Sequence, residues 1–158
     1  MTKVSMPFSL SPLDVKFIGP KPVEEASVTM FYGLEDNREL IIQRKRNGHC
    51  FYTTFSGSKT GIEIHSSGIN ELTAKLPAIV DDLRACDVSR NIMVAGELFV
   101  DVNGYDNLGT FSGIARSNKD RAIALQKDRS VQLAVFNIIV HKGRSVIYYP
   151  YKDRLDML

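Results

Sequence analysis

Cysteine is scarce in this sequence, and neither sign of charge is in clear excess. Its 158 residues include two cysteines, Cys50 and Cys86, with no CxxC pair and no His-rich segment at metal-ligand spacing. They support neither a disulfide framework nor a zinc site, and they favour a reducing compartment. Twenty Lys and Arg residues against 18 Asp and Glu leave a formal net charge of +2. Because so small an excess does not indicate a nucleic-acid-binding protein, any such role has to come from local clusters of charge.

Long apolar runs are also missing. A transmembrane helix needs about 18 or more consecutive apolar residues, and a signal peptide needs a shorter apolar run near the N-terminus. The sequence contains neither kind of run. We therefore expect a soluble, cytoplasmic protein with no membrane partner.

The composition is ordinary for a globular protein, with 44% hydrophobic and 24% charged residues at a length typical of one domain.

Near the N-terminus the sequence has few periodic stretches and several prolines, namely Pro7, Pro12, Pro20 and Pro22. We predict that residues 1–27 form an extended lead-in and that residues 28–158 form the domain.

Short runs rich in β-branched and aromatic residues follow residue 27, separated by turn residues, as is typical of strands. The predicted strands are VTMFYG, ELIIQRKR, HCFYTTF, GIEIH, NIMVAGELFV, VQLAVFNIIV and SVIYYP. Helical spacing is found instead in residues 71–86, where Pro77 suits a first turn, and in residues 118–127, with Ala122, Ile123 and Leu125 as buried positions. Residues 151–158 are predicted to begin a further helix. The predicted fold class is therefore α+β, with mostly antiparallel sheets and inserted helices.

A dense cluster of positive charge, Arg44-Lys45-Arg46, ends one predicted strand and is followed by Asn47-Gly48. One interpretation is an exposed hairpin tip, because Asn-Gly between two strands is the strongest short hairpin signal. The other interpretation follows from strand alternation, which places Gln43 and Lys45 on one face and Arg44 and Arg46 on the other. A lysine on an inner face could act as a nucleophile if burial or nearby cations lower its pKa from about 10.4.

Glu97 lies within a strongly apolar predicted strand. Alternation places Ile92, Val94, Leu98 and Val100 on one face of this strand and leaves Glu97 on the other. Either the strand is an edge strand with Glu97 in water, or Glu97 lines a cleft and accepts hydrogen bonds from a bound hydroxyl or cation.

Phe136 lies in the nearly continuous apolar run 133–140, which is predicted to be covered on both faces. Its ring either packs in the core or stacks on a purine. The histidines at positions 49, 65 and 141 have no spacing that indicates a shared metal or a catalytic triad, so no metal ligands are predicted.

In their order and spacing, these segments resemble the adenylation domain of an ATP-dependent DNA ligase. The resemblance covers about residues 39–158 and rests on ELIIQRKRNG, SSGINELTAKLPAIVDDL, NIMVAGELFVD, TFSGIAR, LAVFNIIV and YYPYKDRLDML. It implies a nucleotidyltransferase fold that is incomplete at the C-terminus. The Glu-Gly and Lys-x-Lys segments of the family, and its oligonucleotide-binding barrel, would follow the Pro-Tyr-x-x-Arg segment at residues 150–154. We therefore expect a fragment, or one half of a split enzyme completed by a second chain.

The resemblance also implies roles for single residues. Lys45 falls on the lysine of Lys-x-Asp-Gly, which attacks the α-phosphate of ATP in the presence of Mg²⁺. Gln43 falls on an adenine-contacting position that is usually Glu, Glu97 on a ribose-contacting glutamate, and Phe136 on the aromatic residue that stacks on the purine. We expect Arg44 and Arg46 to contact nucleic-acid phosphates. The implied function is ATP-dependent sealing of nicked duplex DNA through a lysyl-AMP intermediate.

Some positions differ from the family pattern, each by the loss of a charge. Asn47 stands in place of Asp, Cys50 in place of Arg, Ser67 near an Arg of the family, and Asn137 in place of Asp. A thiol does not replace the fork of donors that an arginine offers. Two alternatives to a DNA ligase therefore stay open. One is a degenerate ligase-like module that binds nucleic acid or has a structural role, and the other is an RNA ligase, since some of these carry Lys-x-Asn-Gly.

Overall fold

The computed structural model describes residues 41, 43–57, 61–68, 70–86 and 91–158. The predicted lead-in 1–27 and the predicted strand VTMFYG lie outside the described residues. The strands are β1 (His49–Phe55), β2 (Ile62–Ser66), β3 (Ile92–Val102), β4 (Tyr105–Asp106), β5 (Val131–His141) and β6 (Arg144–Ser145). The helices are the 3₁₀-helix η1 (Thr73–Lys75), α2 (Pro77–Ala85), α3 (Leu108–Arg116), α4 (Lys119–Leu125) and α5 (Tyr151–Leu155).

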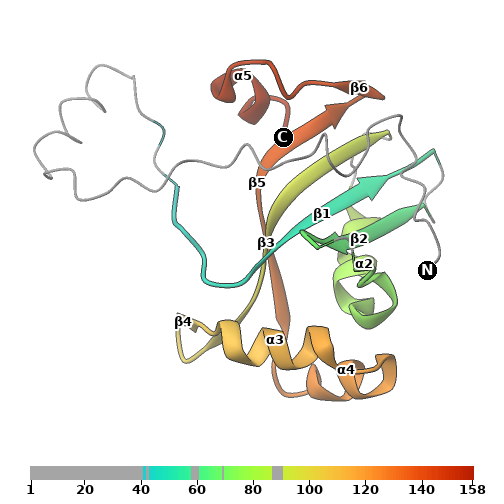
Figure 1. Ribbon diagram of the computed structural model, residues 1–158, viewed down its shortest axis with the longest axis vertical. Helices are drawn as coiled ribbons and strands as arrows, with labels where there is room; N and C mark the ends of the chain where they lie inside the picture. The colour runs from blue at the N-terminus through green and yellow to red at the C-terminus, as the bar shows by residue number, and fades with distance from the viewer. Residues whose placement is uncertain (1–40, 42, 58–60, 69, 87–90) are drawn as a thin grey trace, which may run out of the picture.

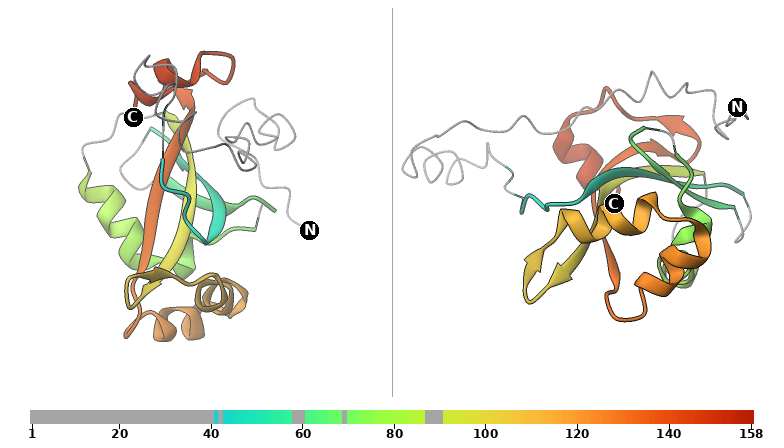
Figure 2. Two further views of the ribbon diagram at one scale, coloured as in Figure 1. Left: turned by 90° about the vertical axis from the view of Figure 1, so that its left-hand side faces the viewer. Right: turned by 60° about the horizontal axis from the view of Figure 1, so that its bottom comes forward.

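The strands form one antiparallel sheet in the order β2-β1-β3-β5-β6, with β4 pairing with β3. The sheet is curled, with α3 and α4 across one end and α5 at the other (Figure 1). Helix α2 lies against one side of the sheet (Figure 2). Two tight turns with positive φ connect antiparallel neighbours, Asn103-Gly104 between β3 and β4 and Lys142-Gly143 between β5 and β6. The predicted α+β class is confirmed.

Apolar side chains pack on both faces of the sheet. The larger cluster joins Leu98 and Val100 of β3 to residues from η1–α2, α3 and α4. The smaller cluster, on the other face, contains Met93 and Ala95 of β3. This division confirms the prediction that Ile92, Val94, Leu98 and Val100 share one face of their strand. Glu97 therefore faces the side with less apolar cover.

The helices follow local signals. Helix α2 begins at Pro77, as predicted, because a missing N–H is harmless at the first helical position. Asn107 and Asn118 cap α3 and α4 by accepting the backbone N–H groups of Thr110 and Arg121. Helix α3 was not predicted. In α4, Ala122 is buried as predicted, but Leu125 is exposed and Ile123 is only half-buried.

Three strand predictions need correction. Residues 41 and 43–48 are not part of a strand, so ELIIQRKR does not form one in the part that the structure describes. SVIYYP contributes only the end of β6 and then turns into α5, leaving the Tyr148 side chain 90% exposed. The run 133–140 is covered on both faces only from Asn137 onward. Earlier in β5, Leu133 and Ala134 are only half-buried and Val135 is exposed.

No helix in the described part of the chain combines the length and the apolar character that crossing a membrane requires.

Candidate active site

The segment that precedes β1 is an irregular loop, residues 43–48. The predicted hairpin at Asn47-Gly48 is wrong, because neither residue has the positive φ of such a turn and no strand precedes them within the described residues. Gly48 instead lies directly against β3. A Cβ atom at this position would be 2.1 Å from the carbonyl oxygen of Leu98. Glycine is therefore required here by the close approach of two backbones.

Two carboxylates from the sheet hold this loop. Glu97 accepts a hydrogen bond from the backbone N–H of Gly48 at 3.1 Å, and Asp106 accepts one from the N–H of Asn47 at 3.1 Å. The Asp106 side chain is only 7% exposed. Since these backbone N–H groups lie two and three residues after Lys45, the two bonds fix the path of the chain that carries the lysine.

The two arginines of the loop turn toward the same carboxylate. The guanidinium of Arg46 is 3.1 Å from Asp106 Oδ1 and lies over the Phe99 ring, while that of Arg44 is 3.8 Å from the same oxygen. This agrees with the predicted alternation, in which Arg44 and Arg46 share a side. Their exposures differ, at 62% for the Arg44 side chain and 27% for that of Arg46. Lys45 is exposed.

Glu97 lies at the centre of this face. In the sheet register it is opposite Cys50 of β1 and Ala134 of β5, two small side chains. Burial raises the pKa of Glu97 above its ordinary value of 4.5, and Asp106 adds to the rise. The Gly48 N–H and the nearby Lys45 cation oppose it. Glu97 is thus a half-buried acceptor near Lys45, and since β3 lies between β1 and β5, the alternative of an edge strand with Glu97 in water is wrong.

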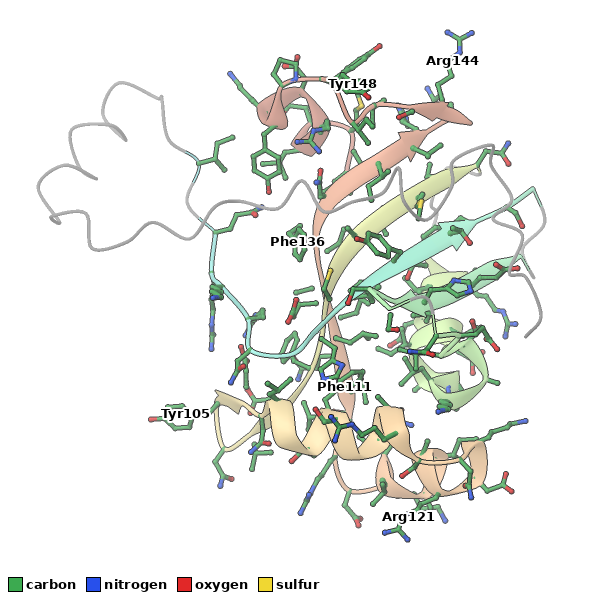
Figure 3. The ribbon with its side chains drawn as sticks, viewed as in Figure 1. Tyr105, Phe111, Arg121, Phe136, Arg144 and Tyr148 are labelled. Atoms are coloured by element: carbon green, nitrogen blue, oxygen red, sulfur yellow. The ribbon has the colours of Figure 1, made fainter. Side chains whose placement is uncertain are left out.

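Phe136 occupies a β-bulge. Gly96 pairs with Val135 and Ala95 with Asn137, so β5 has one residue more than β3 at this point, and that residue is Phe136. Bulges re-aim side chains and are frequent next to active sites. The ring packs, half-buried, against the smaller apolar cluster. It leaves β5 on the side along which the loop 43–48 runs (Figure 3).

Helix α5 connects Gln43 to β5. The Tyr151 hydroxyl is 2.6 Å from the side-chain oxygen of Gln43 and 2.7 Å from the carbonyl oxygen of Phe136. Burial raises the pKa of Tyr151, while the Gln43 contact and the Arg154 cation oppose the rise. The guanidinium of Arg154 lies 5.3 Å from the centre of the Tyr151 ring and donates to Asn137 at 2.8 Å. Gln43 and Phe136, far apart in the sequence, are therefore joined through one hydroxyl.

Two further groups with raised pKa values line the same face. Burial, reinforced by the charge of Glu97, raises the pKa of Cys50 to about 11. Burial, reinforced by Cys50, raises the pKa of Tyr52 to about 12. Both side chains are therefore neutral at physiological pH.

The four residues predicted to act on ATP (Gln43, Lys45, Glu97 and Phe136) thus come together around one face of the sheet, on the loop, β3 and β5. Among the described residues, no group of three or more His, Cys, Asp or Glu side chains could hold a metal ion. Mg²⁺ in phosphoryl-transfer sites typically keeps several waters and binds substrate phosphates with one or two carboxylates. Of the two carboxylates on this face, Asp106 has a partner on each oxygen, and Glu97 accepts from Gly48 on one of its oxygens.

Comparison with known families gives a match over most of the chain. The family model that matches is the ATP dependent DNA ligase domain, and it covers residues 23–158. The chain belongs to this family. The resemblance inferred from the sequence is therefore confirmed.

Solved structures show the same fold for this ligase domain. One is the crystal structure of the ligase domain from M. tuberculosis LigD, and another is mycobacterial DNA ligase D complexed with ATP and MES. Each is 19% identical to this chain, with a TM-score of 0.51. The match covers 71% of this chain and 33% of the other, so the chain spans about one third of the length of either structure. No curated protein matches the chain significantly.

Two residues of this candidate site have no role that the sequence predicted. Asp106 follows the Asn-Gly turn of the β3–β4 hairpin, and that turn is the only local signal that could have placed it beside the loop. Tyr151 belongs to the Pro-Tyr-x-x-Arg segment, but no local pattern connects it to Gln43, which is 108 residues away.

Proposed function

We propose that this chain is the part of an ATP-dependent DNA ligase that binds ATP and carries the adenylated lysine, Lys45. The observation that supports this most is the convergence of Gln43, Lys45, Glu97 and Phe136 on one face of the sheet. Glu97 contacts the loop of Lys45 directly, at the N–H of Gly48, and Tyr151 joins Gln43 to Phe136. ATP is also the ligand named for mycobacterial DNA ligase D, which has the same fold.

The shape and chemistry of this face suit a nucleoside. Phe136 presents a half-buried aromatic ring, which can stack on a purine. Glu97 is flanked across the sheet by the small side chains of Cys50 and Ala134, which leaves its second oxygen room to accept hydrogen bonds from ribose hydroxyls. Gln43 would meet the edge of the base.

In the proposed step, the lone pair of the Lys45 Nζ attacks the α-phosphorus of ATP. A phosphorus–nitrogen bond forms, the bond from the α-phosphorus to the bridging oxygen breaks, and pyrophosphate leaves while the amine loses its proton to solvent. The AMP would then pass to the 5′-phosphate of nicked duplex DNA and leave when the 3′-hydroxyl attacks that phosphate. Mg²⁺, when bound, would neutralise charge on the phosphates. The contacts of Asn47 and Gly48 with the sheet hold the attacking lysine in place.

Of the two arginines proposed to contact nucleic acid, Arg44 suits the role better. Its side chain is 62% exposed and 3.8 Å from Asp106, a contact that a DNA phosphate could replace. Arg46 lies between Asp106 and the Phe99 ring, so its first function is to hold the loop.

Nucleotide binding tests the proposal. We expect ATP with Mg²⁺ to raise the melting temperature of the chain, and we expect Phe136→Ala and Lys45→Ala to abolish this increase. The matched controls are Val135→Ala and Lys127→Ala, which change exposed residues and should preserve it. Because the chain spans one third of the matched structures, we expect little covalent AMP on Lys45 by intact mass. The absence of any ATP effect would refute the proposal.

A second candidate, a ligase-like module that binds nucleic acid without catalysis, is favoured by the neutral residues at charged positions of the family. The Arg154 side chain, for example, is 4% exposed and donates to the neutral Asn137. For such a module we expect no effect of ATP, together with DNA retention that falls steeply with salt. Comparing nicked DNA with nicked RNA as ligands separates the DNA ligase from the RNA ligase alternative.

A further inference from the structure

A hollow lies between α3 and α4, which cross the end of the sheet opposite to α5 (Figure 1). Its volume is about 270 Å³, and none of the residues that line it belongs to the candidate active site. Gly109 and Gly113 leave the α3 side of the hollow without side chains, and a Cβ atom at Gly113 would meet nothing within 4 Å. The described part of the chain thus leaves room here for a side chain from another molecule.

Apolar side chains line the same hollow. Ile114 of α3 belongs to the core, whereas Leu125 of α4 is 36% exposed. A large apolar side chain that entered the hollow would cover Leu125 and lie against the bare backbone of Gly113. Burying such a side chain is favourable in proportion to the apolar area removed from water.

Two arginines complete the lining, Arg121 of α4 and Arg129 after the helix. Both are exposed, and Arg121 extends from this end of the molecule (Figure 3). Neither forms an ion pair with any carboxylate among the described residues. Residues 116–129 contain five basic and two acidic side chains, a net charge of +3, whereas the whole chain carries only +2. Positive charge is therefore concentrated around the hollow.

We propose that the hollow between α3 and α4 docks an acidic segment of a partner protein, with one apolar side chain in the hollow and carboxylates paired with Arg121 and Arg129. Guanidinium groups bind carboxylates through paired hydrogen bonds, so the charge of this end of the molecule selects acidic flanks. The apolar lining favours a peptide over a nucleic-acid backbone, which is also anionic but has no apolar side chain to bury against Leu125. The inference does not depend on the chemistry of Lys45.

Short fluorescein-labelled peptides test this docking on the full 158-residue chain by fluorescence anisotropy. One peptide has a leucine between acidic flanks, a second has serine in place of the leucine, and a third has the leucine between basic flanks. We expect the acidic leucine peptide to bind on the order of 10-fold more tightly than the acidic serine peptide, because only leucine fills the hollow. The basic peptide should not bind, and added salt should weaken binding of both acidic peptides.

Variants locate the binding site. Gly113→Leu places a side chain in the hollow, so we expect it to lower the affinity for the acidic leucine peptide to that for the serine peptide. Gly113→Ala adds only a methyl group and should have a smaller effect in the same direction. Because the Cβ position is open, both variants should melt at or above the wild-type temperature, which shows that they are folded.

The double variant Arg121→Gln/Arg129→Gln should weaken binding of both acidic peptides on the order of 10-fold. Its matched control is Lys142→Gln/Arg144→Gln, which removes the same charge from exposed residues at the β5–β6 turn and should keep the wild-type affinities.

Three results would overturn the inference. The first is equal affinity for the leucine and serine peptides, which would mean that charge alone attracts them. The second is no binding of the acidic leucine peptide at concentrations up to about 1 mM, the range of the weakest specific contacts. The third is an affinity for duplex DNA that falls in Arg121→Gln/Arg129→Gln while peptide binding does not, which would make this end of the molecule a nucleic-acid surface.

Discussion

The carboxylate of Asp106 lies 3.1 Å from the backbone nitrogen of Asn47, two residues beyond Lys45. The two partners are 59 residues apart in the sequence. Since Asp106 also binds Arg46, the loop before β1 is fixed by β4 through both its main chain and a side chain. The position of Lys45 relative to the sheet thus depends on the β3–β4 hairpin.

Replacing Asp106 with asparagine should therefore destabilise the protein. Asp106→Asn removes the negative charge and leaves one acceptor oxygen for three donors, so we expect the free energy of unfolding to fall by about 1–3 kcal/mol. Urea denaturation measures the change. Asp128→Asn is the control, because Asp128 is exposed and its replacement should be nearly neutral. Equal effects of the two substitutions would contradict the anchoring role of Asp106.

Two glycine-to-alanine substitutions should act in opposite directions. At Gly48 a Cβ atom would clash with the Leu98 carbonyl, so Gly48→Ala should destabilise by about 1–3 kcal/mol or displace the loop. At Gly113, within α3, a Cβ atom would meet nothing within 4 Å, so Gly113→Ala should stabilise by about 0.8–1 kcal/mol through helix propensity. Thermal and urea unfolding of both variants test this pair, and destabilisation by Gly113→Ala would show that something contacts that helix face.

Glu97→Gln should change the pH dependence of stability. Burial raises the pKa of Glu97 in the folded protein above 4.5, its value in the unfolded chain. In the pH window between the unfolded and the folded pKa, the folded protein therefore binds this proton more tightly than the unfolded chain does. Stability is therefore lost as the pH rises through this window, and the loss persists at neutral pH. The variant lacks this loss and keeps an acceptor for Gly48. We expect it to be more stable than wild type at neutral pH, with no advantage below pH 4.5.

The control for this measurement is Glu63→Gln, since Glu63 is exposed on β2. Its unfolding free energy should follow that of the wild type across the same pH range. An advantage of Glu97→Gln that grew toward acid pH would mean that the charged form of Glu97 is favoured by folding, contrary to the dominant effect of burial.

Cys50 should resist alkylation. Burial raises the pKa of Cys50 from 9.0 to about 11, so at pH 8 its reactive thiolate is on the order of 100-fold scarcer than that of an ordinary thiol. We expect iodoacetamide to modify the exposed Cys86 on the order of 100-fold faster, as measured by peptide mass spectrometry. Because the charge of Glu97 contributes to the raised pKa, Glu97→Gln should accelerate labelling of Cys50. Equal rates for the two cysteines would contradict this assignment.

Sequence patterns predicted the parts of the fold that depend on local periodicity. The alternation in β3 and the spacing in α2 follow directly from which face is buried. Helix α3 escaped prediction because Gly109 and Gly113 lower its helix propensity, although Phe111 and Ile114 face the core. Residues 43–48 were predicted to extend a strand because side chains there were assigned alternately to two faces. In the structure, Asp106 binds the Arg46 side chain and the N–H of Asn47, and Glu97 binds the N–H of Gly48, so carboxylates and not a neighbouring strand hold this loop.

The candidate site was predictable only where a motif marks it. Lys45, Glu97 and Phe136 were assigned through the family resemblance, and they stay proposals for the chemistry itself. Asp106 and Tyr151 act through contacts across 59 and 108 residues, which no local pattern reports. The re-aiming of Phe136 by a bulge was likewise hidden, because a bulge is a mismatch between two strands and is not visible in either one alone.

The loop that carries Lys45 is held near both of its ends. At one end Gly48 lies against the backbone of β3, and at the other end the Gln43 side chain contacts Tyr151 of α5. These two contacts restrain the backbone on either side of Lys45. Leu98 of β3 and Tyr151 of α5, which lie outside the loop, thus limit where the Lys45 backbone can lie.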